Sequence, residues 1–156
     1  LFRHELDLKS GKVSRHRLSD RGCEFPCVNP DHVGKKYQYA YVSGSANEGT
    51  WYSPFYGLTK IDVQNKGNDK FWLPEEGHFG AEPIFVKATD AKKEDDGYVL
   101  MCVWNSKENK SYLAILDAEN LEFICSVDLD HHLGYGLHGS FKYADSKKKI
   151  EEKVTA

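Results

Sequence analysis

Three short motifs carry side chains that could take part in metal chemistry. They are Glu24-Phe-Pro, Glu82-Pro-Ile-Phe-Val and Gly136-Leu-His138-Gly139. Each lies where a turn meets a strand-like run, and each sets one carboxylate or imidazole beside prolines or glycines that shape the backbone. One imidazole and two carboxylates in such settings indicate a metal centre with supporting groups around its ligand.

His138 is the strongest ligand candidate. The glycines at 136 and 139 allow a positive φ or a close backbone approach, so the imidazole can point inward from the end of a strand. Imidazole suits iron, zinc, copper and nickel, so this residue alone does not identify the metal. The alternative is a histidine that caps a turn by hydrogen bonding, and the residues alone leave both open.

Glu24 and Glu82 are candidates for the supporting carboxylates. Both lie just before a proline at the entry to an apolar strand, where an unpaired buried carboxylate is costly. The N–H of a metal-bound histidine is a suitable partner, because it fixes the tautomer and the orientation of the ring. The alternative is an ordinary ion pair with Arg or Lys at a strand end.

Two other groups of polar residues are weaker metal candidates. Glu94-Asp-Asp-Gly97 resembles an acidic cation loop but lacks the alternating ligand spacing of a calcium loop, so we expect a solvated hairpin turn. The other histidines lack the glycine frame of His138. We expect His131 and His132 to line the site at most, and the rest to lie on the surface: His4, His16, His32 and His78.

The composition sets limits on the fold and the function. The chain has 156 residues, enough for one domain with a real core, and 13% of them are aromatic. The net charge of −3, with both signs mixed along the chain, argues against a nucleic-acid partner. No run approaches 18 apolar residues. The four cysteines form no C-x-x-C pair, which favours free thiols in a reducing compartment.

Short β-type runs separated by turn residues predict an all-β fold. Four strands are expected within about 45 residues, the length of one propeller blade, at 81–87, 98–104, 111–118 and 121–127. Residues 37–73 resemble most of a preceding blade, and residues 6–18 offer two weak strands around Ser10-Gly11. A last strand is expected at 140–144. The domain then covers 1–145, followed by a charged, frayed tail at 146–156.

This pattern accounts for about three blades, whereas propellers close with four to eight. The chain also begins at Leu1 without an initiator methionine. We therefore expect a fragment, the C-terminal part of a larger propeller.

Taken in order, the motifs resemble the C-terminal portion of the carotenoid cleavage oxygenase family, in particular its animal branch of carotene oxygenases and retinoid isomerohydrolase. The resemblance runs from about residue 5 to 143. The residues that carry it are Glu24-Phe-Pro-Cys-Val-Asn-Pro, Tyr37-Gln-Tyr-Ala-Tyr, Leu58-Thr-Lys-Ile-Asp-Val, Gly77-His-Phe-Gly-Ala-Glu-Pro-Ile-Phe-Val, Glu94-Asp-Asp-Gly, Leu116-Asp-Ala and Gly136-Leu-His-Gly-Ser-Phe.

The resemblance implies a seven-bladed β-propeller that holds Fe(II) on its axis through four histidines, with glutamates behind three of them. By position, His138 matches the last histidine ligand, and Glu24 and Glu82 match two of the glutamates. The other three histidines and the first glutamate would lie upstream of Leu1. The chain alone is therefore expected to be inactive and to bind iron weakly.

The reaction that the resemblance implies is the insertion of O₂ across a double bond of a carotenoid or apocarotenoid, which gives two carbonyl products. Two alternatives stay open: a retinoid isomerohydrolase with the same histidine and glutamate set, and a non-catalytic propeller that binds a partner or lipid. The sparse cysteines favour an intracellular protein, cytoplasmic or mitochondrial, and a lipid-soluble polyene substrate favours peripheral contact with a membrane.

Overall fold

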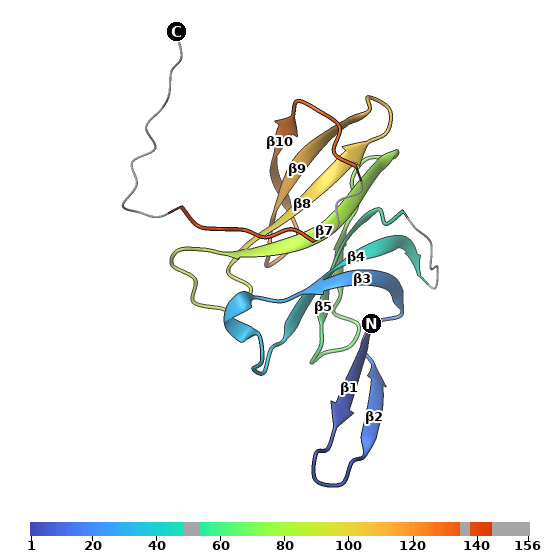
Figure 1. Cartoon of the computed structure of the whole chain (residues 1–156), viewed down its shortest axis with the longest axis vertical. Coiled ribbons are helices and arrows are strands. Elements are labelled where there is room, and N and C mark those ends of the chain that lie inside the picture. Colours follow the sequence, from blue (N-terminus) through green and yellow to red (C-terminus); the bar gives the residue numbers. More distant parts are fainter. Residues whose placement is uncertain (49–53, 135–137, 145–156) are drawn as a thin grey trace.

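The protein is built from antiparallel β-strands (Figure 1). The structure is a computed structural model that describes residues 1–48, 54–134 and 138–144, without the side chains of 46–48. Its strands are β1 (Phe2–Leu6), β2 (Val13–Arg17), β3 (Arg21–Cys27), β4 (Tyr39–Glu48), β5 (Gly57–Asp62), β6 (Lys70–Trp72), β7 (His78–Lys87), β8 (Gly97–Asn105), β9 (Lys110–Asp117) and β10 (Phe123–Leu129). A single turn of 3₁₀ helix spans Pro30–His32.

Two four-stranded sheets contain eight of the ten strands in the described residues. The first has the order β3-β4-β5-β6 and the second the order β10-β9-β8-β7. The all-β class and the four strands expected between 81 and 127 are confirmed. The expected count of three blades is wrong for the described residues, because β1 and β2 form only a two-stranded hairpin.

The two sheets pack against each other through alternate residues of their strands. On β8, Val99, Met101 and Val103 are buried while the residues between them are more exposed, as expected for a strand with one face on the core. These side chains form one cluster with Tyr41 and Leu58 of the first sheet. The core therefore lies between the sheets and holds β3 and β7 side by side (Figure 1).

The N-terminal hairpin projects away from the two sheets (Figure 1), and the Arg3 guanidinium at its base donates to the carbonyl of Val63, directly after β5, at 3.5 Å. Its turn forms where Asp7 Oδ1 accepts hydrogen bonds from the backbone N–H groups of Lys9 and Ser10, at 2.9 and 3.3 Å. Hydrogen bonding with Ser10 and these two N–H groups lowers the pKa of Asp7. Of the two weak strands expected within residues 6–18, one is confirmed as β2, whereas β1 ends at Leu6 and lies almost wholly before that range.

Residues 138–144 do not form the strand expected at 140–144. They cross the second sheet near β7 (Figure 1) and attach to it through side chains instead of a backbone ladder. Gly139 N–H donates to the Glu82 carboxylate at 3.1 Å, and the Tyr143 hydroxyl donates to the Lys87 carbonyl at 2.8 Å. The predicted tail at 146–156 lies outside the described residues.

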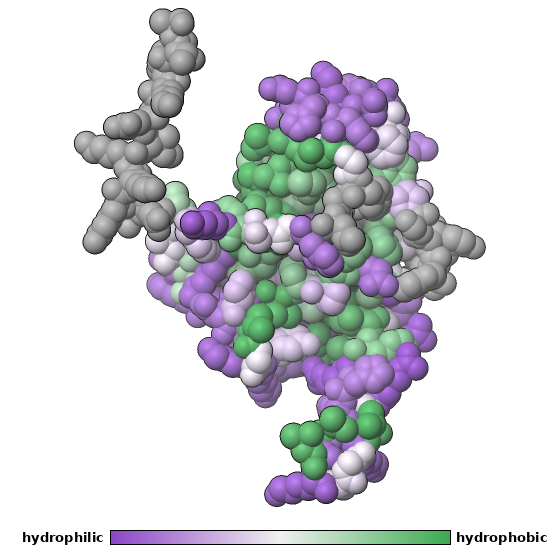
Figure 2. Space-filling view, in the orientation of Figure 1, coloured by the Kyte–Doolittle hydropathy of each residue, from purple (hydrophilic) through white to green (hydrophobic). Residues whose placement is uncertain are grey.

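The surface of the second sheet is apolar where residues 138–144 cross it (Figure 2). Ile84, Leu100 and Leu113 project from β7, β8 and β9 on this side, next to Phe141. In the part of the chain that the structure describes, no helix has the length and apolar character needed to cross a membrane.

The acidic motif Glu94-Asp-Asp-Gly97 forms a turn, as expected, but only Asp96 behaves as a solvated turn residue. Its carboxylate accepts from the N–H groups of Lys92 and Lys93, at 2.7 and 2.8 Å. Glu94 instead accepts from the N–H groups of Gln38 and Tyr39 at the start of β4. The turn therefore fastens the second sheet to the first.

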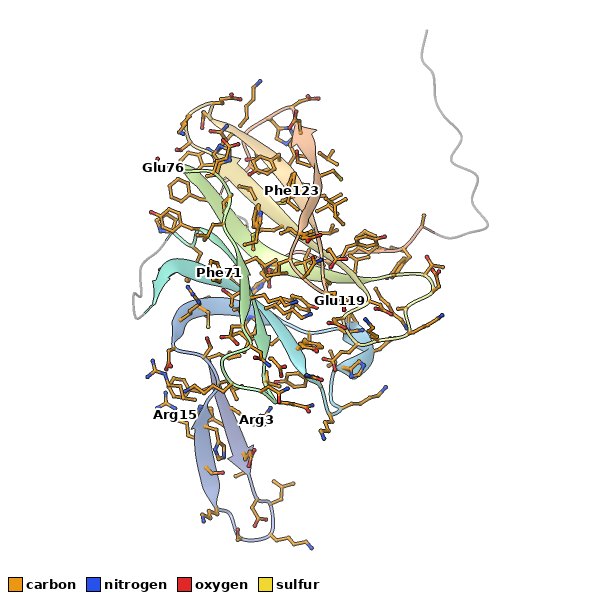
Figure 3. All side chains as sticks on the ribbon, turned by 180° about the vertical axis from the view of Figure 1, so that it is seen from behind. Arg3, Arg15, Phe71, Glu76, Glu119 and Phe123 are labelled. Carbon is orange, nitrogen blue, oxygen red and sulfur yellow. The ribbon has the colours of Figure 1, made fainter. Side chains whose placement is uncertain are left out.

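Asp95 makes the second connection in this turn. It is buried and lies 2.6 Å from the ammonium group of Lys60, which is also buried. The same ammonium donates to the carbonyl of Glu119 at 2.8 Å, in the turn between β9 and β10 where the two sheets meet (Figure 3). We call Lys60 and Asp95 the inter-sheet ion pair.

All four cysteines are free thiols, as expected: Cys23, Cys27, Cys102 and Cys125. Cys27 lies at the end of β3, and burial raises the pKa of its thiol to about 12. The folded protein therefore keeps a proton on Cys27 that the unfolded chain releases above about pH 9. Stability from this group is full below pH 9 and is lost as the pH rises towards 12.

We expect the free energy of unfolding to fall by up to about 1.4 kcal/mol per pH unit over that window because of Cys27 alone. Urea unfolding between pH 8 and 11.5 measures this slope. Cys27→Ala should make it shallower, leaving the contributions of the other groups whose pKa burial raises, namely Cys102, Tyr39, Tyr41 and Tyr112. Cys125→Ala removes an exposed thiol and should leave the slope unchanged; equal slopes for the wild type and Cys27→Ala would contradict the prediction.

Candidate metal centre

Both predicted glutamates lie at bulges on the neighbouring edge strands β3 and β7. The β3–β4 pairing passes from Glu24↔Ser43 to Cys27↔Tyr41, and the β7–β8 pairing from Gly80↔Val103 to Pro83↔Met101. In each case three steps on the edge strand oppose two on its partner. Such an extra residue bends a strand and turns a side chain out of the regular alternation. Proline, which cannot donate to a ladder, is tolerated at a bulge.

Glu82 and His138, which are 56 residues apart, are in contact. One carboxylate oxygen of Glu82 lies 3.3 Å from Nδ1 of His138, and the other accepts a hydrogen bond from the N–H of Gly139 at 3.1 Å. The carboxylate therefore holds the ring and the backbone next to it. A proton on Nδ1 would be shared with Glu82 and would leave Nε2 as the free ligand atom.

His138 has a positive φ of 61° and its side chain is 75% exposed, whereas that of Glu82 is 22% exposed. A left-handed conformation is uncommon for a non-glycine residue. Here it accompanies two hydrogen-bonding contacts to one carboxylate. Of the glycine frame predicted around His138, Gly139 is described, and Gly136 lies outside the described residues.

Phe25 forms an aromatic wall beside the imidazole. Its φ is 52°, inside the β3 bulge, and its ring meets the His138 ring edge-on, with the centroids 6.3 Å apart. Phe55 packs edge-on against Phe25, with the ring centroids 6.1 Å apart. The β3 bulge therefore brings an apolar surface to the ring that Glu82 holds.

Glu24 does not contact His138. It is half-buried on β3, and its carboxylate makes no hydrogen bond or ion pair within the described residues. Its carboxylate is thus available to a group that these residues do not supply. The structure brings together two of the three predicted site residues and leaves Glu24 on the adjacent strand.

An apolar pocket of about 430 Å³ opens next to His138. Ile84, Leu100, Cys102, Leu113 and Phe141 are among the residues that line it. Glu82 and His138 line it as well, so the imidazole lies next to both a carboxylate and hydrocarbon.

The described residues supply part of a metal site but not a complete set of ligands. They contain no group of three or more His, Cys, Asp or Glu side chains placed to hold a metal ion. His138 offers one imidazole with a carboxylate on one ring nitrogen, the arrangement that supports a metal-bound histidine. Further ligands must therefore come from elsewhere if a metal binds here.

One surface prediction was wrong and one neighbour was missed. His78 is buried and not on the surface. Its ring packs on the ring of Tyr112, and its Nδ1 lies 3.1 Å from the Tyr112 hydroxyl. The sequence pattern also gave no sign of Ser43, which lies opposite Glu24 in the sheet and donates to the carbonyl of Ala81. The position of Ser43 depends on how the strands pair, which the sequence pattern does not give.

Comparison with known proteins identifies the family. Residues 1–143 match the family described as retinal pigment epithelial membrane protein (RPE65). The chain belongs to this family. It is the carotenoid cleavage oxygenase family, so the family that the motifs resemble is confirmed.

Members from distant organisms match the chain at similar levels. It is 34% identical over 143 residues to apocarotenoid-15,15'-oxygenase of Synechocystis sp., which covers 90% of this chain and 29% of the relative. It is 40% identical over 128 residues to β,β-carotene 15,15'-dioxygenase of Gallus gallus, which covers 77% of this chain and 22% of the relative. The chain therefore spans less than a third of the length of these relatives.

The folds agree as well. The crystal structure of cobalt-substituted Synechocystis ACO aligns with a TM-score of 0.86 and 32% identity, over 92% of this chain and 30% of that chain. An ACO/RPE65 chimera aligns with a TM-score of 0.85 and 33% identity, over the same shares. The antiparallel sheets of this carotenoid oxygenase family member thus match part of an oxygenase.

Proposed function

We propose that the protein containing this chain is an Fe(II)-dependent dioxygenase that cleaves a double bond of a carotenoid or apocarotenoid. The chain would form the last blades of its seven-bladed propeller. The contact between Glu82 and His138 carries the proposal, since a carboxylate on Nδ1 leaves Nε2 for a metal. The names of the relatives support cleavage of a carotenoid or apocarotenoid.

Each predicted site residue has a distinct role in this proposal. His138 is one of four histidine ligands, Glu82 fixes its ring, and Glu24 fixes a histidine that lies outside the described residues. Bound Fe(II) supplies the redox chemistry for adding both atoms of O₂ across one C=C bond, which yields two C=O groups. The half-buried position of Glu24, without a partner here, supports its role.

The substrate is expected to approach His138 along hydrocarbon. Phe25 contacts the imidazole and Phe55 packs on Phe25, and apolar side chains are what a polyene requires. A substrate that partitions into lipid also favours peripheral contact with a membrane. We propose an intracellular location, cytoplasmic or mitochondrial, where free thiols persist.

Product analysis of the full-length protein tests the proposal. The purified protein is loaded with Fe(II) under air and given β-carotene, an apocarotenal or a retinyl ester in separate reactions. We expect carbonyl products that carry ¹⁸O from ¹⁸O₂ with β-carotene or the apocarotenal. An isomerised retinol from the retinyl ester would instead indicate an isomerohydrolase. Stoichiometric binding of one of these substrates without any product would indicate a binding module. Either result would contradict the proposal.

A further inference from the structure

The bulge that places Glu82 leaves the backbone of Ala81 outside the regular ladder. Pairing between β7 and β8 stops at Gly80 and resumes at Pro83, so Ala81 and Glu82 are the unpaired residues. Ala81 is buried, at 8% exposure. A buried carbonyl without a hydrogen bond is costly, so this one needs a partner from outside its own sheet.

Ser43 of the first sheet supplies that partner. Its hydroxyl donates to the Ala81 carbonyl, and the side chain is fully buried on β4. The bond joins the two sheets at the residue directly before Glu82. Next to this bond, Tyr56, the residue before β5, bridges the same two strands: its N–H donates to the Gly44 carbonyl of β4, and its carbonyl accepts from the N–H of Gly80 of β7, both at 3.2 Å. The β7 bulge is therefore tied to β4 directly through Ser43 and, at the adjacent residues, through Tyr56.

Ser43 also lies next to the other glutamate. It is the cross-strand partner of Glu24 in the β3–β4 ladder, and the β3 bulge begins directly after this pair. One buried residue thus contacts the backbone that presents Glu82 and pairs with the residue that presents Glu24. Among the described residues, only Ser43 both donates to the Ala81 carbonyl and pairs with Glu24.

We propose that Ser43 is a positioning residue of the metal centre: its hydrogen bond to Ala81 holds the β7 bulge in the form that directs the Glu82 carboxylate at His138 and Gly139. This role deepens the proposed function and rests on it for its catalytic meaning. The role does not require Ser43 to touch metal or substrate. It acts through the backbone of Ala81 and the carboxylate of Glu82.

Hydrogen exchange at the Gly139 amide tests this role without metal, because that amide donates to Glu82. In the iron-free full-length protein, Ser43→Ala should lower the protection of Gly139 by about fivefold, the loss expected for one hydrogen bond. Core amides of β8 should change less. The matched control is Ser111→Ala, which also deletes a buried serine hydroxyl, one bonded to the backbone of Leu133. That control should leave Gly139 unchanged.

Unchanged protection of Gly139 in Ser43→Ala, or a drop equal to that of the β8 core amides, would overturn the proposal. The second readout is iron affinity by chelator competition. Ser43→Ala should weaken it by about threefold to tenfold, below the range for removing a carboxylate that supports a ligand, and Ser111→Ala should not. If the wild type binds no iron, the proposed function fails, and Gly139 exchange still decides whether Ser43 places Glu82.

Discussion

Replacing His138 by alanine in the full-length protein should weaken Fe(II) binding by more than about 100-fold and abolish cleavage of the polyene. Loss of a group that only supports a metal ligand typically costs 10- to 100-fold in affinity or activity, and loss of the ligand itself should cost more. Glu82 holds the imidazole ring, with one carboxylate oxygen 3.3 Å from Nδ1 of His138. Chelator competition and product formation measure the two effects.

Glu82→Gln separates the ligand from its support. The amide can still occupy the space of the carboxylate but cannot carry its charge, so we expect a loss of about 10- to 100-fold in iron affinity, smaller than that of His138→Ala. The matched control is His16→Ala. His16 lies 3.5 Å from Glu5 in the hairpin, so this variant also breaks a contact between histidine and carboxylate. Iron affinity equal to the wild type in His138→Ala would show that His138 is not a ligand.

The strands of the second sheet were predictable because each buries one face, and this leaves an alternating pattern in the sequence. Val99, Met101 and Val103 alternate with more exposed residues, and the pattern gives both the strand and its orientation. The strands of the N-terminal hairpin are mostly exposed and have no such buried face, so only the turn residues Ser10-Gly11 indicated them. A local pattern could not give the number of blades, since that depends on which strands pair with one another.

The failure at 140–144 has a similar cause. Ser140-Phe-Lys-Tyr alternates like a strand, but its attachment to the sheet runs through the Glu82 carboxylate, by way of Gly139, and the Tyr143 hydroxyl. These bonds replace a backbone ladder. A pattern of apolar residues says which side faces the protein and does not say which atoms make the hydrogen bonds.

The candidate site shows the same division. Glu82 and His138 stood out by their residue types and by the prolines and glycines near them, and the structure places them in contact. The bulges that aim the glutamates and the bond from Ser43 to Ala81 were not predictable, because both depend on how strands pair. The role of the acidic turn was missed likewise, since its partners Gln38, Tyr39 and Lys60 are 35 or more residues away.

The acidic turn leads to the largest expected effect on stability. Asp95→Ala removes the carboxylate of the inter-sheet ion pair and leaves the buried Lys60 ammonium with only the Glu119 carbonyl and the faces of two tyrosine rings. Breaking a buried pair in this way typically costs about 3–5 kcal/mol. We expect a loss of this order in the free energy of unfolding, measured by urea at pH 7.

The pH dependence of that loss gives a second test. Burial lowers the pKa of Lys60 even with Asp95 present, and removing the carboxylate should lower it further. Between this lowered pKa and the unfolded value near 10.4, the unfolded chain binds the extra proton, so the stability of Asp95→Ala should rise with pH. The deficit relative to the wild type should therefore be larger at pH 6 than at pH 9.

The matched control is Asp31→Ala. Asp31 and Lys87 lie 2.6 Å apart, the same distance as in the inter-sheet ion pair, but both side chains are exposed. An exposed pair contributes little, so this variant should unfold like the wild type. Adding Lys60→Met to Asp95→Ala should recover most of the loss, because an apolar side chain removes the unpaired charge. Equal effects of Asp31→Ala and Asp95→Ala would mean that burial of the pair does not set its contribution.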